Sequence, residues 1–113
     1  MDPYVPEAGD LVWTDFDPRV GREQSGRRPA LVLSASDFYR ASEFAIVCPI
    51  TSRVRPFGTS VVLPPELPIS GEILTSHVRS IDTQARPISF AGAAVPAAIL
   101  DEVRGKLAAL LGI

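Results

Sequence analysis

The segment around which the chain is organised, residues 21–34, reads Gly-Arg-Glu-Gln-Ser-Gly-Arg-Arg-Pro-Ala-Leu-Val-Leu-Ser. A polar loop rich in glycine and arginine runs directly into a short apolar segment, which predicts a buried strand over residues 30–34. Pro29 fixes the junction, because it disfavours helix at Arg28 and has no backbone N–H to donate. Arg28 is therefore expected at the start of a rigid element, where a guanidinium can hold a phosphate. The alternative is a solvated loop whose arginines serve only solubility.

Length and composition predict a single domain over residues 1–113. A hydrophobic content of 46% excludes disorder, yet no apolar run has the length of a membrane span. The first residues lack the basic and apolar regions of a signal peptide, so we expect a cytoplasmic protein. A single cysteine, Cys48, and a single histidine, His77, argue against an internal disulfide and a structural zinc site. We therefore expect no metal and no cofactor.

The charge distribution favours a small local contact with nucleic acid. A net charge of −2 argues against a broad grip on duplex nucleic acid. Basic residues nevertheless gather in two loops, Arg19, Arg22, Arg27 and Arg28 in one, Arg53 and Arg55 in the other. A local basic groove on an acidic body suits a short single-stranded segment better than a long duplex.

The remaining pattern predicts several short strands. β-Branched and aromatic composition indicates strands over residues 10–16, 44–50 and 59–63, with a short helical turn over residues 35–43. Pro49 suggests a bulge or an edge position in the second of these strands. Residues 71–74 and 78–82 resemble one strand broken by polar residues 75–77, and residues 88–90 add a last short pairing.

One convincing helix follows, opened by Pro96 and ended near Gly112. Its apolar stripe at helical spacing consists of Ile99, Val103, Leu107, Leu110 and Leu111. Short strands with one closing helix predict a mainly β fold, a small bent antiparallel sheet or barrel with a C-terminal α-helix.

Several sequence blocks, in order, resemble toxins of the MazF/PemK family. They are Gly-Asp-Leu-Val-Trp (9–13), Asp-Phe-Asp-Pro (15–18), the whole stretch 21–34, Pro-Ile-Thr-Ser (49–52), Val-Arg-Ser-Ile-Asp (78–82) and the helix end at 107–112. The most specific is Glu-Gln-x-Gly-x-Arg-Pro. The resemblance covers almost the whole chain and implies the SH3-like barrel shared by the MazF, CcdB and PemK toxins, a homodimer, and a cognate MazE-like antitoxin.

The resemblance also implies an activity, metal-independent and ribosome-independent cleavage of single-stranded RNA at short sequences. It places the catalytic pair on Arg28 and Thr51, with Glu23 as a third catalytic candidate in the adjoining loop. The ribose 2′-hydroxyl attacks its own phosphodiester, so the protein needs only to position the phosphate and stabilise its charge. The candidate RNA contacts are Arg22, Gln24, Arg27, Ser52, Arg53, Arg55, His77 and Arg79.

The general base stays open between Glu23, His77 and neither. Histidine titrates in the useful range, but the family usually carries another polar residue at the His77 position. The chain also has Thr83–Gln84 where relatives commonly have an aromatic residue, which leaves the RNA sequence preference open.

Three further predictions concern the tryptophan, the cysteine and two aspartates of the first strand. Trp13 is expected in the core, Cys48 as an inert buried thiol, and Asp15 with Asp17 as a solvated strand end.

One alternative function is a toxin of the same fold that poisons DNA gyrase, as the CcdB branch does. That branch relies on a tryptophan where this chain has Leu111. The other alternative is an inactive member that only buffers antitoxin.

Overall fold

The computed structural model describes residues 3–16 and 26–113. Within them a 7-stranded sheet has the order β4-β5-β3-β2-β1-β7, and β6 also pairs with β3. All of these pairings are antiparallel. The strands are β1 (Asp10–Asp15), β2 (Arg27–Val32), β3 (Phe44–Thr51), β4 (Val61–Val62), β5 (Glu72–Ile73), β6 (Arg79–Asp82) and β7 (Ser89–Ala94).

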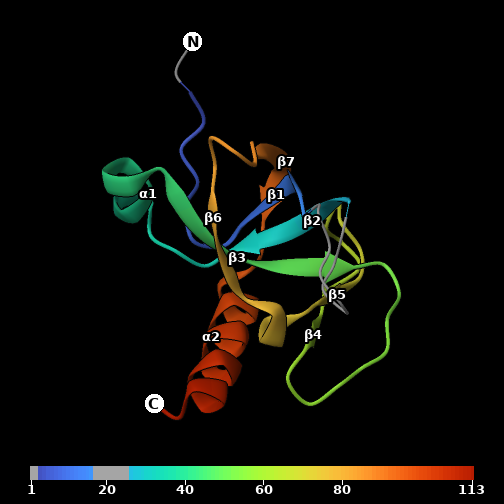
Figure 1. Ribbon diagram of the computed structural model, residues 1–113. Coiled ribbons are helices and arrows are strands. Elements are labelled where there is room, and N and C mark those ends of the chain that lie inside the picture. The colour runs from blue at the N-terminus through green and yellow to red at the C-terminus, as the bar shows by residue number, and fades with distance from the viewer. Residues whose placement is uncertain (1–2, 17–25) are drawn as a thin grey trace.

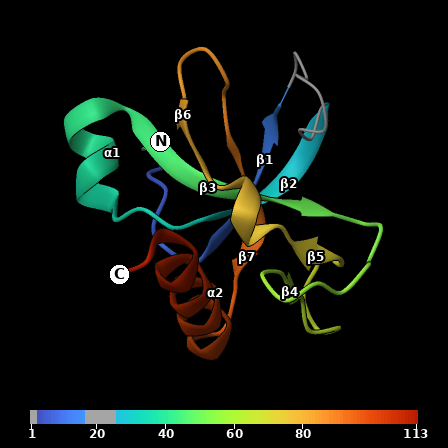
Figure 2. The same ribbon diagram turned by 60° about the horizontal axis from the view of Figure 1, so that its bottom comes forward.

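Two α-helices and one 3-10 turn complete the described elements. Helix α1 (Ser36–Ser42) links β2 to β3, and the 3-10 turn η1 (Thr75–His77) links β5 to β6. Helix α2 (Ala97–Leu111) lies across one end of the curled sheet, whereas α1 stands at its periphery (Figure 1). The two views agree on this arrangement (Figure 2). The predicted mainly β fold with a C-terminal helix is confirmed. None of the helices in the described part of the chain is long and apolar enough to cross a membrane.

The sheet buries a hydrophobic cluster on each face, because successive residues of a strand point to opposite sides. Leu11, Leu31 and Cys48 belong to one cluster, which Val103 of α2 joins. Val12, Ala30 and Val47 belong to the other. This alternation also decides which side chains at the strand ends share a face.

Strand β3 lies inside the sheet, so of the two alternatives predicted at Pro49, a bulge or an edge position, the edge position is wrong. One side of β3 pairs with β2, and the other pairs with β6 over residues 44–47 and with β5 over residues 50–51. Pro49 lies between the part of β3 that pairs with β6 and the part that pairs with β5, so its missing N–H removes no hydrogen bond from either pairing.

The strand predicted over residues 71–82 is broken, as expected, and both of its parts pair with β3.

Strand β2 begins at Arg27, three residues before the predicted start at residue 30. Arg28 and Pro29 pair with Thr14 and Trp13 of β1, so Arg28 lies within a strand and not in a loop. The sequence predicted the junction between loop and strand at Pro29. Proline tolerates an extended backbone, however, and pairing with β1 extends the strand across Pro29.

Smaller differences concern strand lengths and the helix stripe. Strand β4 has two residues where five were predicted, and β7 has six where three were predicted. In α2, Val103 is buried and Ile99 packs against the core, as predicted, but Leu110 and Leu111 are exposed. Leu100 packs against the core as well, so the apolar stripe faces the sheet mainly through the first half of α2.

Candidate functional site

The sheet places the candidate catalytic residues at the same end of two neighbouring strands. In the β2–β3 ladder, Ala30 lies opposite Pro49, Leu31 opposite Cys48 and Val32 opposite Val47. Arg28 comes two residues before the end of this ladder in β2, and Thr51 two residues beyond it in β3. Thr51 in turn pairs with Glu72 of β5, and Arg28 pairs with Thr14 of β1. Arg28 and Thr51 therefore lie at the same end of the β2–β3 pair, near the end of β3.

The Thr51 hydroxyl has a defined orientation. Its Oγ1 accepts a hydrogen bond from the backbone N–H of Arg53 at 3.2 Å. Because the oxygen acts as acceptor in this bond, the hydroxyl proton remains available to donate to a bound oxyanion. This arrangement suits a side chain that contacts a phosphoryl oxygen.

Two hollows lie on either side of the end of β3. The first, which we call the Thr51 hollow, has a volume of about 390 Å³ and is bordered by Thr51, Arg53, Arg55, Phe57, Thr59, Ser60, Glu72, Leu74, Ser76 and His77. The second, the Trp13 hollow, has a volume of about 330 Å³ and is bordered by Trp13, Arg27, Arg28, Pro29, Ile50, Ser52, Pro68, Ile69 and Ser70. Each hollow thus combines arginine side chains with hydroxyl groups and apolar surface.

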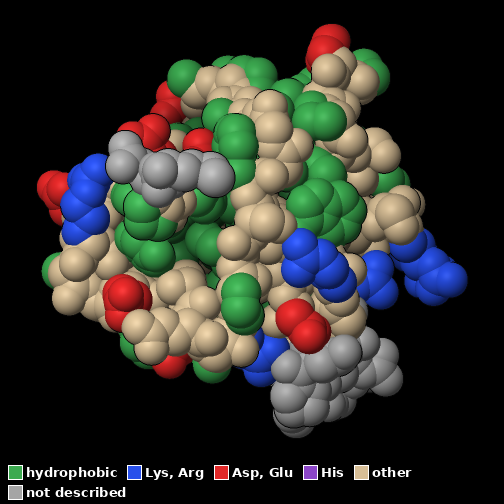
Figure 3. All heavy atoms as spheres, turned by 90° about the horizontal axis from the view of Figure 1, so that it is seen from above, with side chains coloured by type: hydrophobic (Ala, Val, Ile, Leu, Met, Phe, Trp, Pro, Cys, Tyr) green, Lys and Arg blue, Asp and Glu red, His purple; other side chains and the backbone are tan. Residues whose placement is uncertain are grey.

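Basic side chains gather on this side of the molecule. Viewed from above, most of the visible arginine and lysine side chains lie at the edge toward which β3 runs (Figure 3). Arg53 and Arg55 are exposed at the Thr51 hollow, and Arg27 is exposed at the Trp13 hollow. Arg27 also donates a hydrogen bond from Nη2 to Ser89 Oγ at 2.7 Å, which connects β2 to β7. Such a gathering of arginines provides several forks for phosphate on an otherwise acidic protein.

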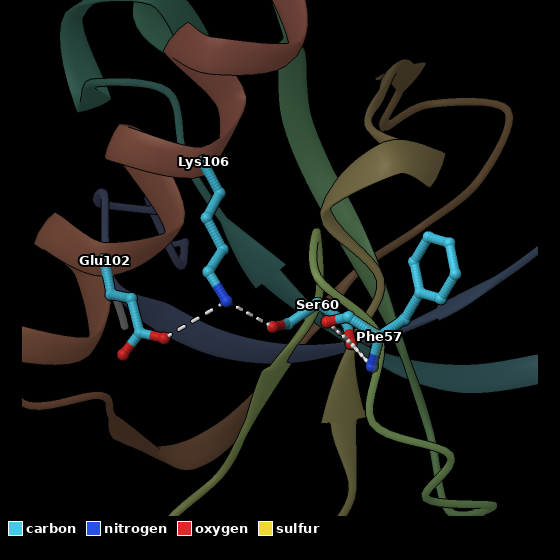
Figure 4. Close-up of polar contacts among 4 residues, drawn as sticks. All are labelled: Phe57, Ser60, Glu102 and Lys106. Carbon is cyan, nitrogen blue, oxygen red and sulfur yellow. Dashed lines mark hydrogen bonds and ion pairs between the residues drawn. The ribbon is translucent and has the colours of Figure 1, made fainter.

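Helix α2 supports one wall of the Thr51 hollow. Lys106 Nζ donates a hydrogen bond to the backbone carbonyl of Ser60 at 2.8 Å and lies 3.4 Å from Glu102 Oε2. Ser60 also closes a turn with Phe57 through backbone and side-chain hydrogen bonds. The Phe57 ring points away from α2 (Figure 4). The helix therefore holds the turn that carries Phe57 to the mouth of the hollow.

The predicted site residues fall into three groups. Arg28, Thr51, Arg27, Ser52, Arg53, Arg55 and His77 border one or other hollow. Arg79 borders neither; its guanidinium carbon lies 5.7 Å from the centroid of the Phe16 ring, a cation–π distance. The predictions on Arg22, Glu23, Gln24 and Asp17 lie outside the described residues.

Three other side chains, described below, agree with the predictions made from the sequence. Trp13 packs against the first hydrophobic cluster, as predicted, and also borders its hollow. Asp15 is exposed at the end of β1. Burial raises the pKa of the Cys48 thiol to about 12, which keeps it protonated at neutral pH and supports the prediction of an inert thiol.

Glu72 is a site residue that the sequence prediction missed. It is only 2% exposed, yet it borders the Thr51 hollow, and its Oε2 has no hydrogen-bond partner among the described residues. The sequence offered one signal for it, an acidic residue within the short apolar segment 71–74. Because carboxylates are rarely buried without a partner, an acid in such a segment is a candidate site residue.

Comparisons with known proteins show which family the chain is similar to. Residues 7–111 match the family model of the PemK-like, MazF-like toxin of type II toxin–antitoxin systems. The chain is 36% identical over 109 residues to the endoribonuclease toxin MazF of Escherichia coli K12, covering 96% of each chain. It is 47% identical to the crystal structure of MazF from Deinococcus radiodurans, with a TM-score of 0.93 over 98% of this chain and 100% of the other.

A second solved relative is the MazE–MazF complex of Deinococcus radiodurans. It is 43% identical, with a TM-score of 0.85 over 98% of this chain and 99% of that chain. Similarity of this extent, in sequence and in fold, covers both hollows and the strands that form them. The chain belongs to the family of PemK-like, MazF-like toxins of type II toxin–antitoxin systems.

Proposed function

We propose that this protein is an endoribonuclease toxin that cuts single-stranded RNA at short sequences in the cytoplasm, without a ribosome or a metal ion. The observation that carries the proposal is that Arg28 and Thr51, at the same end of the β2–β3 pair, each border a hollow that other arginine side chains also border. Relatives with more than 30% identity are named endoribonucleases, which supports the same activity.

The reaction needs positioning more than a protein nucleophile. The 2′-oxygen of the ribose attacks the adjacent phosphorus, the bond to the 5′-oxygen breaks, and a 2′,3′-cyclic phosphate and a 5′-hydroxyl result. The 2′-hydroxyl proton passes to a base, and the leaving 5′-oxygen takes up a proton. Arg28 stabilises the phosphoryl oxygens through its planar fork, and Thr51 donates one more hydrogen bond.

Two groups compete for the role of base. His77 borders the same hollow as Thr51, which supports its contact with RNA, and Glu23 is the candidate from the arginine-rich loop. If neither side chain acts, a water molecule or an oxygen of the substrate accepts the 2′-hydroxyl proton. We propose that Arg53 and Arg55 contact flanking phosphates, and that Arg22, Gln24, Arg27, Ser52 and Arg79 make further contacts with the RNA.

We further propose that the protein forms a homodimer and is inhibited by a MazE-like antitoxin. Exposed apolar side chains support an interface, among them Phe90, Leu110 and Leu111. A solved relative with 43% identity is a MazE–MazF complex. Because an inhibitor of this site competes with RNA phosphate, we expect the antitoxin segment that covers it to be acidic. Light scattering that shows a monomer at micromolar concentration would count against the dimer.

The test is incubation of the purified protein with a long single-stranded RNA in EDTA, followed by mapping of the cut ends. We expect cleavage at a short recurring sequence, with 5′-hydroxyl ends. Intact RNA under these conditions, together with inhibition of supercoiling by purified gyrase, would favour the gyrase alternative instead.

A further inference from the structure

Glu72 is an unusual side chain for the wall of an RNA-binding hollow. It lies in β5, directly opposite Thr51, and is 2% exposed. Its Oε2 has no hydrogen-bond partner among the described residues, and neither of the ion pairs recorded there includes Glu72. A buried carboxylate without a partner is costly. Its position at the hollow suggests that a ligand supplies the missing donor.

The rest of the Thr51 hollow has the features of a nucleotide subsite. Its volume of about 390 Å³ is at the small end of the range for ligand pockets, which suits a single nucleotide. Phe57 is 73% exposed and His77 is half-buried, and both ring types serve as stacking surfaces for unpaired bases. Arg53 and Arg55 provide cations for the neighbouring phosphates.

We propose that the Thr51 hollow binds one nucleobase next to the cut, and that Glu72 selects a base with an exocyclic amino group. The inference rests on the proposed function and adds the chemistry of one recognised base. Carboxylate oxygens accept hydrogen bonds, and the amino groups of adenine, cytosine and guanine donate them. Where cytosine has its amino group, uracil has a carbonyl oxygen, so at that position it would face Glu72 with an acceptor.

Contacts with neighbouring elements hold Phe57 and Glu72 at the wall of the hollow. The hydrogen bond from Lys106 holds the carbonyl of Ser60 and thus the turn that carries Phe57. Glu72 is held from the other side by its pairing with Thr51 and Val62. Phe57 and Glu72 are therefore both held at the border of the same hollow.

The experiment compares cleavage of a randomised RNA library by the wild type, Glu72→Gln and the control Glu66→Gln. Glu66 is an exposed acid in the loop between β4 and β5 that does not border the hollow. We expect the wild type and the control to require an amino-bearing base at one position near the cut. Glu72→Gln, which can also donate a hydrogen bond, should accept uracil there and keep its preferences elsewhere.

A second arm uses only the wild type, so it does not depend on the folding of a variant. The selected base is replaced by its counterpart without the amino group: inosine for guanosine, purine riboside for adenosine, or 2-pyrimidinone riboside for cytidine. We expect kcat/KM to fall by about 5- to 150-fold, the range for one specific base contact.

The outcomes separate the two proposals. No cleavage by the wild type would contradict the proposed function itself. Cleavage in which every position near the cut accepts uracil, or in which removal of the amino group has no effect, would contradict only the role of Glu72. Relaxation confined to one position in Glu72→Gln supports both.

Discussion

Gly71 lies against the backbone of Thr51 so closely that a Cβ on Gly71 would overlap the Thr51 carbonyl oxygen. Its φ of +135° is also one that side-chain-bearing residues rarely adopt. The glycine therefore allows β5 to approach the end of β3, and this approach places Glu72 beside Thr51.

Gly71→Ala should accordingly impair both stability and activity. Backbone strain alone costs about 1 to 3 kcal/mol, and relief of the overlap must move the Thr51 backbone. We expect a lower midpoint of denaturant unfolding and a reduced kcat. The control is Gly58→Ala, where an added Cβ meets no atom within 4 Å; an equal loss of stability and activity in both variants would contradict this account.

Lys106→Met tests the support of the Thr51 hollow by α2. The variant leaves the Ser60 carbonyl without its donor, which costs about 1 kcal/mol of unfolding free energy, whereas the half-exposed pair with Glu102 adds little. Because the turn that carries Phe57 loosens, we expect KM for RNA to rise more than kcat falls. Lys106→Arg should restore most of the affinity, and Arg104→Met, an exposed change on the same helix, should have no effect. An unchanged KM in Lys106→Met would refute the supporting role.

Arg28→Lys separates a bidentate fork from a simple charge. If Arg28 stabilises the phosphoryl oxygens through two parallel hydrogen bonds, lysine should fail nearly as badly as alanine. Loss of one preorganised donor typically lowers kcat by about a hundred- to a thousandfold. Because Arg28 lies within β2, circular dichroism should check that both variants fold. Arg40→Ala on α1 is the control; near-normal kcat in Arg28→Lys would count against the fork.

His77→Gln addresses the general base. We expect most of the activity to remain and the pH–rate profile to change little, because glutamine retains a polar contact at the Thr51 hollow. A histidine base would instead produce a limb in the pH–rate profile that disappears in the variant, with a large loss of rate. Profiles of wild type and variant measured side by side decide between these outcomes.

The sequence predicts the broken strand at residues 71–82 and the C-terminal helix correctly, since composition and periodicity report local structure. It places the start of β2 wrongly, because pairing with Trp13 and Thr14 of β1 extends the strand across Pro29. Such pairing is a tertiary effect that no local pattern contains. Likewise, Arg28 and Thr51 come from the family resemblance, and only the pairing of β2 with β3 shows that these residues, far apart in the chain, lie at the same end of two neighbouring strands.

The burial of Glu72 is the clearest limit of prediction from sequence. A carboxylate in a two-residue strand would ordinarily be assigned to the solvent. Its position inside follows from the close approach of Gly71 to Thr51, which depends on the curvature of the whole sheet.

In the proposed mechanism the nucleophile belongs to the RNA, and Arg28 and Thr51 only position and stabilise the phosphate. The most direct test replaces the ribose upstream of a mapped cut by deoxyribose in an otherwise identical oligonucleotide. We predict that cleavage at that bond disappears while binding persists, and that the unmodified RNA gives a 2′,3′-cyclic phosphate. Cleavage of the deoxy substrate at an undiminished rate would contradict the account.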